Sequence, residues 1–219
     1  TIGECRLILG DCREVLPLLA PHDLICTDPP YGIGINKSHR LATSRGHGGE
    51  TWDDKPVPQW LMLLLHEQAK NLIVWGGNYY TMGPARCFLV WDKQNDGRDF
   101  ADCEMAWTNL GASARIFRHY WKGAFRATER GATLHPTQKP IALSAYVFGR
   151  AKLKRGDLVF VPYLGSGPDL PAAQAMGLRV IACDVERWCC DTAIGRLGAI
   201  TTERAAEPCG PLFTFGVKP

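Results

Sequence analysis

The sequence lacks the features that mark membrane, zinc-binding and secreted proteins. Its longest apolar run, Trp60 to Leu65, is far shorter than the roughly 20 residues of a membrane-spanning helix and is typical of a buried helix. No Cys-x-x-Cys pair occurs, so the nine cysteines do not predict a zinc site. Most of them lie in or beside apolar runs, where a free thiol behaves as a small hydrophobe. Since no secretory signal is visible, we expect a reduced, cytoplasmic protein without metal or membrane contact.

The sequence also lacks a strong charge bias. The formal net charge is only +3, which by itself does not identify a nucleic-acid binder. The basic residues are nevertheless clustered, and one of the two clusters is mixed with aromatic residues. The clusters are Arg115, Arg118, His119, Lys122, Arg126 and Arg130, and Lys37, His39, Arg40, Arg45 and His47. Either cluster alone is typical of a solvated surface, but beside a base-binding loop it would form a track for phosphates.

Apolar patterning predicts alternating strands and helices in a chain whose 219 residues suit one α/β domain. We predict strands at 6–9, 24–27, 71–75, 87–91, 104–108, 114–117, 158–161 and 179–183. We predict helices at 11–19, 58–70, 141–151, 168–176 and 185–197. This alternation is typical of a single doubly wound, mostly parallel sheet covered on both faces.

We predict one domain over residues 1–200. Three segments depart from the alternation of strands and helices, two of them inside this domain and one after it. Residues 33–58 are rich in Gly, Ser, His and charge, which predicts a long mobile loop. Residues 92–133 interrupt the pattern and are expected outside the sheet, as an insertion. Residues 201–219 show no helical or strand period, which predicts an irregular tail.

The most informative motif is Asp28-Pro29-Pro30-Tyr31, which follows the apolar run 24–26. The two prolines fix φ and remove two backbone donors, so the corner is stiff and offers the Pro29 carbonyl as an acceptor. Asp28 and that carbonyl suit the two protons of an exocyclic amino group on a planar base, while Tyr31 can stack on the base. The alternative is an ordinary turn in which the aspartate caps a helix.

A second motif, Tyr163-Leu164-Gly165-Ser166-Gly167, follows the strand predicted at 158–161. Gly-x-Gly at a turn between a strand and a helix lets the backbone approach a ligand closely. The next predicted strand is followed by Asp184, which is placed to bind ribose hydroxyls. The alternative is a tight turn together with a capping aspartate.

Two further motifs are His135-Pro136-Thr137-Gln138-Lys139-Pro140 and Gly10-Asp11-Cys12. In the first, the prolines stiffen the chain, and the three residues between them carry side-chain donors that suit a carboxylate. As a bare sequence it could be any proline-rich connector. The second is common helix-capping chemistry, with Asp11 as the cap.

In their nature and order, these motifs resemble the β group of amino-methylating DNA methyltransferases, which use S-adenosyl-L-methionine. The resemblance covers about residues 3–197 and implies a Rossmann-like class I methyltransferase fold in circularly permuted order. It implies a catalytic corner of Asp28, Pro29, Pro30 and Tyr31, acting on N6 of an adenine flipped out of double-stranded DNA. The cofactor residues that it implies are Asp11, Cys12, Asp28, His135, Thr137, Lys139, Tyr163, Gly165, Ser166, Gly167 and Asp184.

For DNA contact we predict Lys37, Arg40, Arg115, Arg118, Lys122 and Arg126, with 92–133 as the target-recognition region. Whether the chain forms a homodimer, or acts beside a cognate nuclease in a restriction-modification system, stays open. Methylation at N4 of cytosine also stays open, although aspartate at the first position of the corner favours adenine. Methylation at C5 needs a nucleophilic cysteine, and Pro208-Cys209 lies in the tail without a cofactor motif beside it.

The cofactor loop departs from the family pattern at three positions. Val161 stands where relatives carry an acid, and Pro168 and Asp169 stand where they carry two threonines. A lost charged hydrogen bond costs about 1.5–3 kcal/mol. The departures therefore favour a second hypothesis, a catalytically impaired DNA-binding relative with weak or absent cofactor binding.

Overall fold

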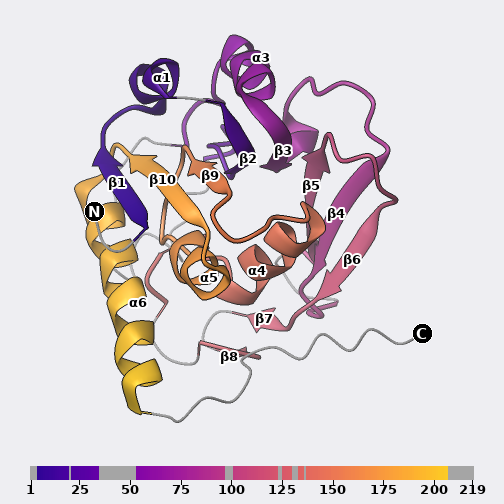
Figure 1. The fold of residues 1–219 in the computed structure, drawn as a ribbon. Helices are drawn as coiled ribbons and strands as arrows, with labels where there is room; N and C mark the ends of the chain where they lie inside the picture. Colours follow the sequence, from indigo (N-terminus) through magenta and orange to yellow (C-terminus); the bar gives the residue numbers. More distant parts are fainter. Residues whose placement is uncertain are drawn as a thin grey trace.

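The computed structural model describes residues 4–19, 21–34, 53–96, 101–122, 125–129, 133–135 and 137–206, with side chains up to residue 198. Its main sheet has eight strands in the order β1-β10-β9-β2-β3-β5-β4-β6 (Figure 1). These strands are β1 (Cys5–Leu9), β2 (His22–Thr27), β3 (Ala69–Trp75), β4 (Cys87–Asp92), β5 (Cys103–Thr108), β6 (Arg115–Arg118), β9 (Leu158–Val161) and β10 (Arg179–Asp184). Two short strands, β7 (Trp121–Lys122) and β8 (Phe125–Arg126), pair separately.

The sheet is parallel from β1 through β10, β9 and β2 to β3. Strand β5 then runs antiparallel to both of its neighbours, and β6 is parallel to β4. The mostly parallel α/β sheet predicted from the sequence is confirmed. As a result, the carboxyl ends of β1, β10, β9, β2 and β3 meet at one edge of the sheet.

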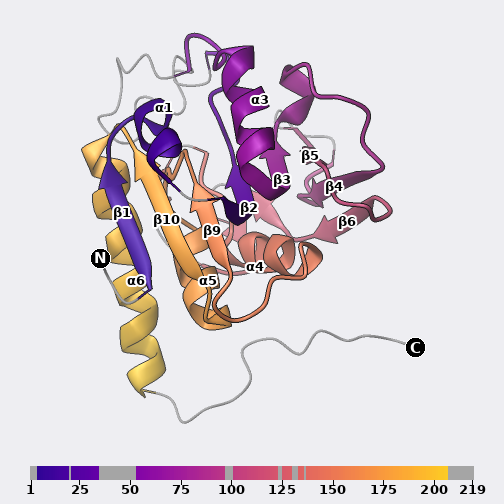
Figure 2. The ribbon, with the colours of Figure 1, turned by 45° about the horizontal axis from the view of Figure 1, so that its top comes forward.

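Helices cover both faces of the sheet (Figures 1 and 2). The helices and 3₁₀ turns are α1 (Cys12–Val15), η1 (Leu16–Leu18), α3 (Gln59–Gln68), η3 (Gly77–Tyr79), α4 (Ile141–Arg150), α5 (Asp169–Met176) and α6 (Arg187–Ala206). On one face, Ile25 and Phe160 pack in a core with Leu65 of α3. On the other, Leu24 packs in a core with Leu170 of α5. Alternate residues of β2 thus enter opposite cores, as expected for a strand buried on both sides.

The prediction that 92–133 lies outside the sheet is wrong for two of its strands, β5 and β6. Strand β5 is hydrogen-bonded between β3 and β4, and β6 forms the edge beside β4. The chain turns back after β4, and Ala106 and Trp107 enter the interior. A rule of alternating strands and helices does not anticipate such an antiparallel return, because the pairing depends on contacts between distant residues.

The prediction of an irregular tail over 201–219 is wrong for residues 201–206, since α6 continues to Ala206. Neither Gly nor Pro occurs from 199 to 206, and Ala205 and Ala206 are good helix formers. Residues 207–219 lie outside the described residues. In the predicted loop 33–58, residues 35–52 lie outside them too, whereas Pro56 pairs with Tyr31. Within the described ranges, no helix is both long and apolar enough to cross a membrane.

Candidate active site

A pocket of about 340 Å³ lies at the edge where the parallel strands end. Each of these strands contributes its last residues or the turn after it. The contributors are Gly10, Asp11 and Cys12 after β1, Asp28 after β2, Trp75 in β3, Tyr163, Gly165 and Ser166 after β9, and Asp184 in β10. The volume falls in the range of about 300–1,000 Å³ that is usual for small-molecule sites.

The structure brings the predicted cofactor residues together. All of them except Gly167 line this pocket, including His135, Thr137 and Lys139 from the segment before α4. Gly167 lies beneath the turn, with φ of +63°, and a Cβ atom there would be 2.4 Å from Cβ of Ala193. It is therefore needed for close packing of the turn on α6.

The corner 28–31 is braced by side chains from other elements. The Tyr80 hydroxyl donates a hydrogen bond to the Pro30 carbonyl. The Gly32 N–H donates to Oδ1 of the buried Asp53 at 2.9 Å. The Tyr31 hydroxyl donates to Oδ1 of Asp28. The corner is thus held by hydrogen bonds as well as by the stiffness of its prolines.

The Tyr31 ring is itself held in a fitted place. One of its faces stacks on Tyr79, with 4.7 Å between ring centroids. Gly76 has φ of +64°, and a Cβ atom there would be 2.1 Å from Cε1 of Tyr31. In the sequence, this glycine directly follows the strand predicted at 71–75 and carries no further signal. In this arrangement Tyr31 orients Asp28, and its stacking on a base stays a prediction.

A chain of ion pairs joins the corner 28–31 to strand β5. The Lys139 ammonium contacts Oδ2 of Asp28 and lies 3.1 Å from Oε2 of Glu104. The Lys93 ammonium lies 2.6 Å from the other Glu104 oxygen. Burial lowers the pKa of Lys139, but Asp28 and Glu104 outweigh this and raise it above its ordinary value. Burial also raises the pKa of Glu104, and the two lysines outweigh it and bring it to about 2.

These contacts add to the role expected for the segment 135–140. Lys139 lines the pocket and also contacts Asp28. The Thr137 hydroxyl lies 3.1 Å from Nδ1 of His135, and the Gln138 amide oxygen accepts from the Leu134 N–H at 2.7 Å. Glu104 was not among the predicted site residues, because its strand was expected outside the sheet.

The turn after β9 is held by Asp184. Its Oδ2 accepts from the Gly165 N–H at 2.8 Å and its Oδ1 from the Glu186 N–H at 2.9 Å. Burial raises the pKa of Asp184. The His135 ring lies over Gly165 and stacks on Trp188, with 5.0 Å between centroids. Each carboxylate oxygen has two lone pairs, so Asp184 can hold the turn and still accept from a ligand hydroxyl.

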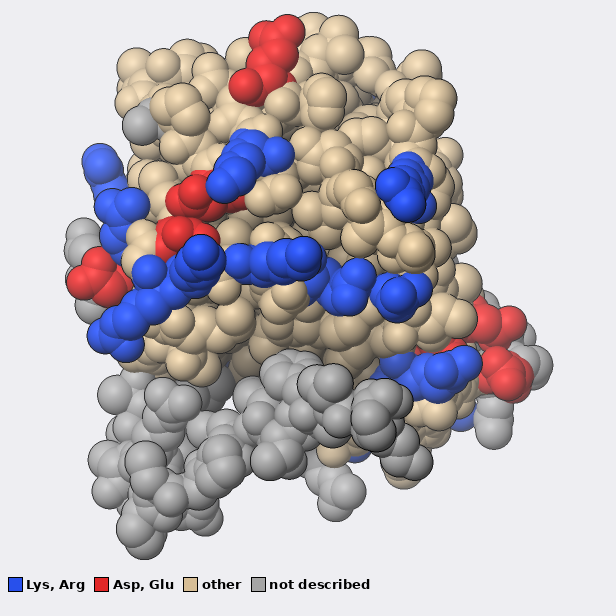
Figure 3. All heavy atoms as spheres, turned by 45° about the vertical axis from the view of Figure 1, so that its right-hand side comes forward, with Lys and Arg blue, Asp and Glu red and all other residues tan. Residues whose placement is uncertain are grey.

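The predicted DNA-contacting residues fall into four groups. Arg115 and Arg118 are exposed on the edge strand β6, on a face where Lys and Arg side chains form a row (Figure 3). Lys122 is half-buried on β7. Arg126 is only 4% exposed and stacks on Trp121 at 4.4 Å, which speaks against a phosphate contact for it. Lys37 and Arg40 lie outside the described residues.

Comparison with known proteins decides the family. The chain is 31% identical to the type II methyltransferase M2.DpnII of Streptococcus pneumoniae, over 88% of this chain and 89% of that protein. The chain belongs to the amino-methylating DNA methyltransferases, which use S-adenosylmethionine. No family model matches it.

Solved methyltransferase structures share the fold. The crystal structure of M1.HpyAVI with S-adenosylmethionine aligns with a TM-score of 0.53 at 18% identity, covering 88% of this chain and all of that chain. The cytosine-N4-specific PvuII DNA methyltransferase aligns with a TM-score of 0.54 at 13% identity, covering 91% and 92% of the two chains. The class I methyltransferase fold expected from the sequence is confirmed.

The residues of this methyltransferase fit its cofactor. Gly165 has φ of +51°, which glycine adopts without strain, and the turn exposes its backbone to the pocket. Asp184, Tyr163 and Asp11 supply polar groups around it. Of the atypical positions, Val161 is buried in the core. Burial raises the pKa of Asp169 to about 6, and a hydrogen bond with Ser144 partly offsets this shift.

Proposed function

We propose that this methyltransferase moves a methyl group to the N6 amino nitrogen of an adenine flipped out of duplex DNA. The observation that carries the proposal is the braced corner, which presents Asp28 to the pocket beside a glycine turn suited to the cofactor. No hydrogen bond from the described residues reaches the Pro29 carbonyl, which can therefore accept from the amino group.

The chemistry assigned to the chain is positioning and proton acceptance. When bound, S-adenosylmethionine supplies an electrophilic methyl group on a good leaving group. Asp28 and the Pro29 carbonyl accept hydrogen bonds from the amino group, which keeps the nitrogen lone pair from delocalising into the ring. The nitrogen gains a positive charge as it is methylated, and Asp28 takes the proton that it then loses. Flipping the base costs a few kcal/mol, and stacking on an aromatic ring returns about 1–3 kcal/mol.

The test is nucleoside mass spectrometry of unmethylated DNA after incubation with the protein and S-adenosylmethionine. We expect N6-methyladenine, and far less of it with Asp28→Asn. Detection of N4-methylcytosine would support the mechanism but show that the target base is cytosine instead of adenine. This outcome is included because the cytosine-N4-specific PvuII enzyme shares the fold. No methylated base from a folded protein at saturating cofactor would overturn the proposal in favour of a catalytically impaired relative.

The impaired relative has its own test, because it rests on Val161, Pro168 and Asp169. Cofactor affinity can be measured by calorimetry for Val161→Asp and Pro168→Thr, alone and together. If Val161 and Pro168 weaken cofactor binding, the restored residues should raise the cofactor affinity about tenfold or more, as expected for a regained charged hydrogen bond. Unchanged affinity would show that the atypical residues do not limit cofactor binding.

A further inference from the structure

Arg196 is a buried charge on α6 that the mechanism above does not use. The residue is 5% exposed. Burial lowers the pKa of Arg196, which Glu129 partly offsets. Removing a guanidinium from water is costly unless good partners replace the water. The partners of Arg196 therefore indicate why the chain keeps a charge at this place.

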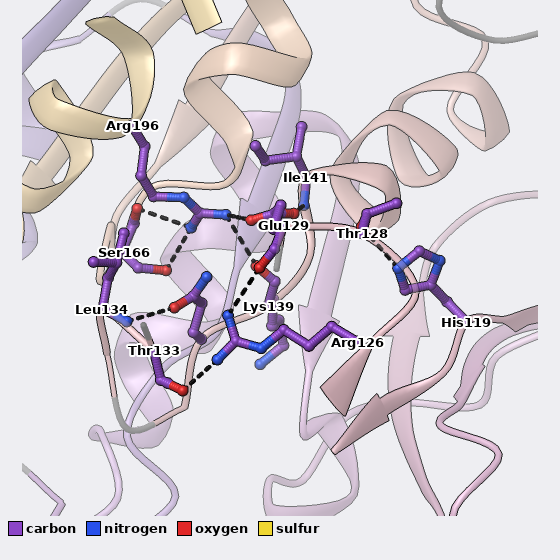
Figure 4. Close-up of polar contacts among 11 residues, drawn as sticks. His119, Arg126, Thr128, Glu129, Thr133, Leu134, Lys139, Ile141, Ser166 and Arg196 are labelled. Atoms are coloured by element: carbon purple, nitrogen blue, oxygen red, sulfur yellow. Dashed lines mark hydrogen bonds and ion pairs between the residues drawn. The ribbon is translucent and has the colours of Figure 1, made fainter. Parts of the chain in front are cut away.

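Those partners come from three separate segments (Figure 4). Nη1 donates to the Ser166 carbonyl at 3.0 Å and to the Ser166 hydroxyl at 2.8 Å, in the glycine turn. Nη2 donates to Glu129, which follows β8, and to the Lys139 carbonyl at 3.4 Å. One side chain thus touches the turn of the cofactor site and the backbone of the lysine that contacts Asp28.

Glu129 extends this junction to the start of α4. Its second carboxylate oxygen accepts from the Ile141 N–H at 2.6 Å, where the N-cap residue, Pro140, makes no side-chain hydrogen bond. Glu129 also adopts φ of +53°, a costly conformation for a residue with a side chain. The backbone at Lys139 and just after it is consequently tied to Arg196, directly at Lys139 and through Glu129 at Ile141.

We propose that Arg196, held by Glu129, is a positioning residue that fixes the glycine turn relative to the Lys139–Asp28 pair. This proposal rests on the proposed function, in which the glycine turn faces the cofactor and Asp28 faces the base. Methyl transfer requires the two sides in a fixed relation, and a displacement of about 1 Å can cost roughly a hundredfold in rate.

The test uses Arg196→Lys, which keeps the charge but cannot reach Ser166 and Glu129 with one planar fork. Three quantities are measured: the cofactor Kd by calorimetry without DNA, kcat at saturating substrates, and the unfolding midpoint without ligand. We expect the cofactor Kd to rise about tenfold and kcat to fall by more than tenfold. The matched control is Arg187→Lys on the same helix, whose exposed side chain lies 3.7 Å from Asp191 and should leave all three values unchanged.

A second variant, Glu129→Gln, keeps an oxygen for the Ile141 N–H and removes only the charge facing Arg196. It should move the cofactor Kd and kcat in the same direction, and its effects should not add to those of Arg196→Lys. If Arg196→Lys does not fold, Glu129→Gln by itself tests the positioning role of Arg196. A lowered unfolding midpoint with unchanged Kd and kcat would overturn the proposal, because Arg196 would then only stabilise the fold. If the wild-type protein forms no methylated base, the proposed function is overturned. The ratio of the cofactor Kd values of the Arg196→Lys variant and the wild-type protein would still test the role of Arg196.

Discussion

The two halves of the sheet supply different parts of the site. In the half from β1 to β3 all strands are parallel, so their carboxyl ends converge and surround the cofactor pocket. In the other half β5 is antiparallel, so it brings its amino end to the same edge. There Glu104, near the start of β5, meets Lys139, while Lys93 comes from the end of β4. The parallel half thus forms the pocket, and the antiparallel return supplies the charges behind Asp28.

The largest effect should come from the parallel half, at Asp28. Asp28→Asn keeps the size of the side chain and removes the proton acceptor, so methyl transfer should fall by about 10²–10⁴-fold. The measurement is incorporation of labelled methyl groups into DNA under single-turnover conditions. Asp191→Asn, at an exposed position on α6, is the control. Activity retained within a few-fold would remove Asp28 from the chemistry.

The close packing of Gly76, which directly follows β3, against the Tyr31 ring of the corner can be disrupted by substitution. In Gly76→Ala the new Cβ would strike the Tyr31 ring at 2.1 Å, at a φ of +64° that alanine disfavours. We expect kcat to fall about tenfold to a hundredfold, because the displaced ring no longer orients Asp28. Gly83→Ala is the matched control, since its Cβ would meet nothing within 4 Å. Equal kinetics for the two variants would show that the corner tolerates movement of Tyr31.

The contribution of the antiparallel half can be isolated at Glu104. Its pKa lies near 2 instead of 4.5, so its ionised form stabilises the fold above about pH 4.5. That stabilisation should fade as the pH falls from 4.5 toward 2. In Glu104→Gln the free energy of unfolding should be lower at neutral pH and should fall less over this interval.

Urea titrations at several pH values measure this change. The same variant should lower kcat about tenfold, since Lys139 loses one of its two anionic partners. Parallel pH profiles for the variant and the wild-type protein would contradict the assigned role of Glu104.

The smallest effect concerns DNA and compares the two ends of the edge strand. Because β6 is parallel to β4, Arg118 lies beside Asp92 near the site edge, whereas Arg115 lies beside Leu89. Arg118→Ala should weaken DNA binding a few-fold and reduce the salt slope of log K by about 0.9, the value for one phosphate. Arg115→Ala should have a smaller effect. A reversed order in fluorescence titrations would move the DNA path away from the site edge.

The motifs predicted most of the site because all of them except residues 135–140 follow a strand whose apolar run is visible in the sequence. Gly165 and Asp184 come after such runs, and the rule that parallel strands share one ligand-binding edge was enough to bring them together. Tyr79, Glu104, Trp188 and Arg196 carry no comparable signal. Each acts through a partner distant in the chain, such as Lys139 for Glu104 and Ser166 for Arg196.

The sequence by itself determined the fold class, the family and many of the pocket-lining residues, since these depend on local periodicity and on short motifs at strand ends. Only the tertiary structure decided that β5 enters the sheet, that Lys139 contacts Asp28, and that Arg126 is buried. The reason is physical. Strand pairing and the pairing of buried charges are set by which distant groups meet in the fold, and no local pattern records that meeting.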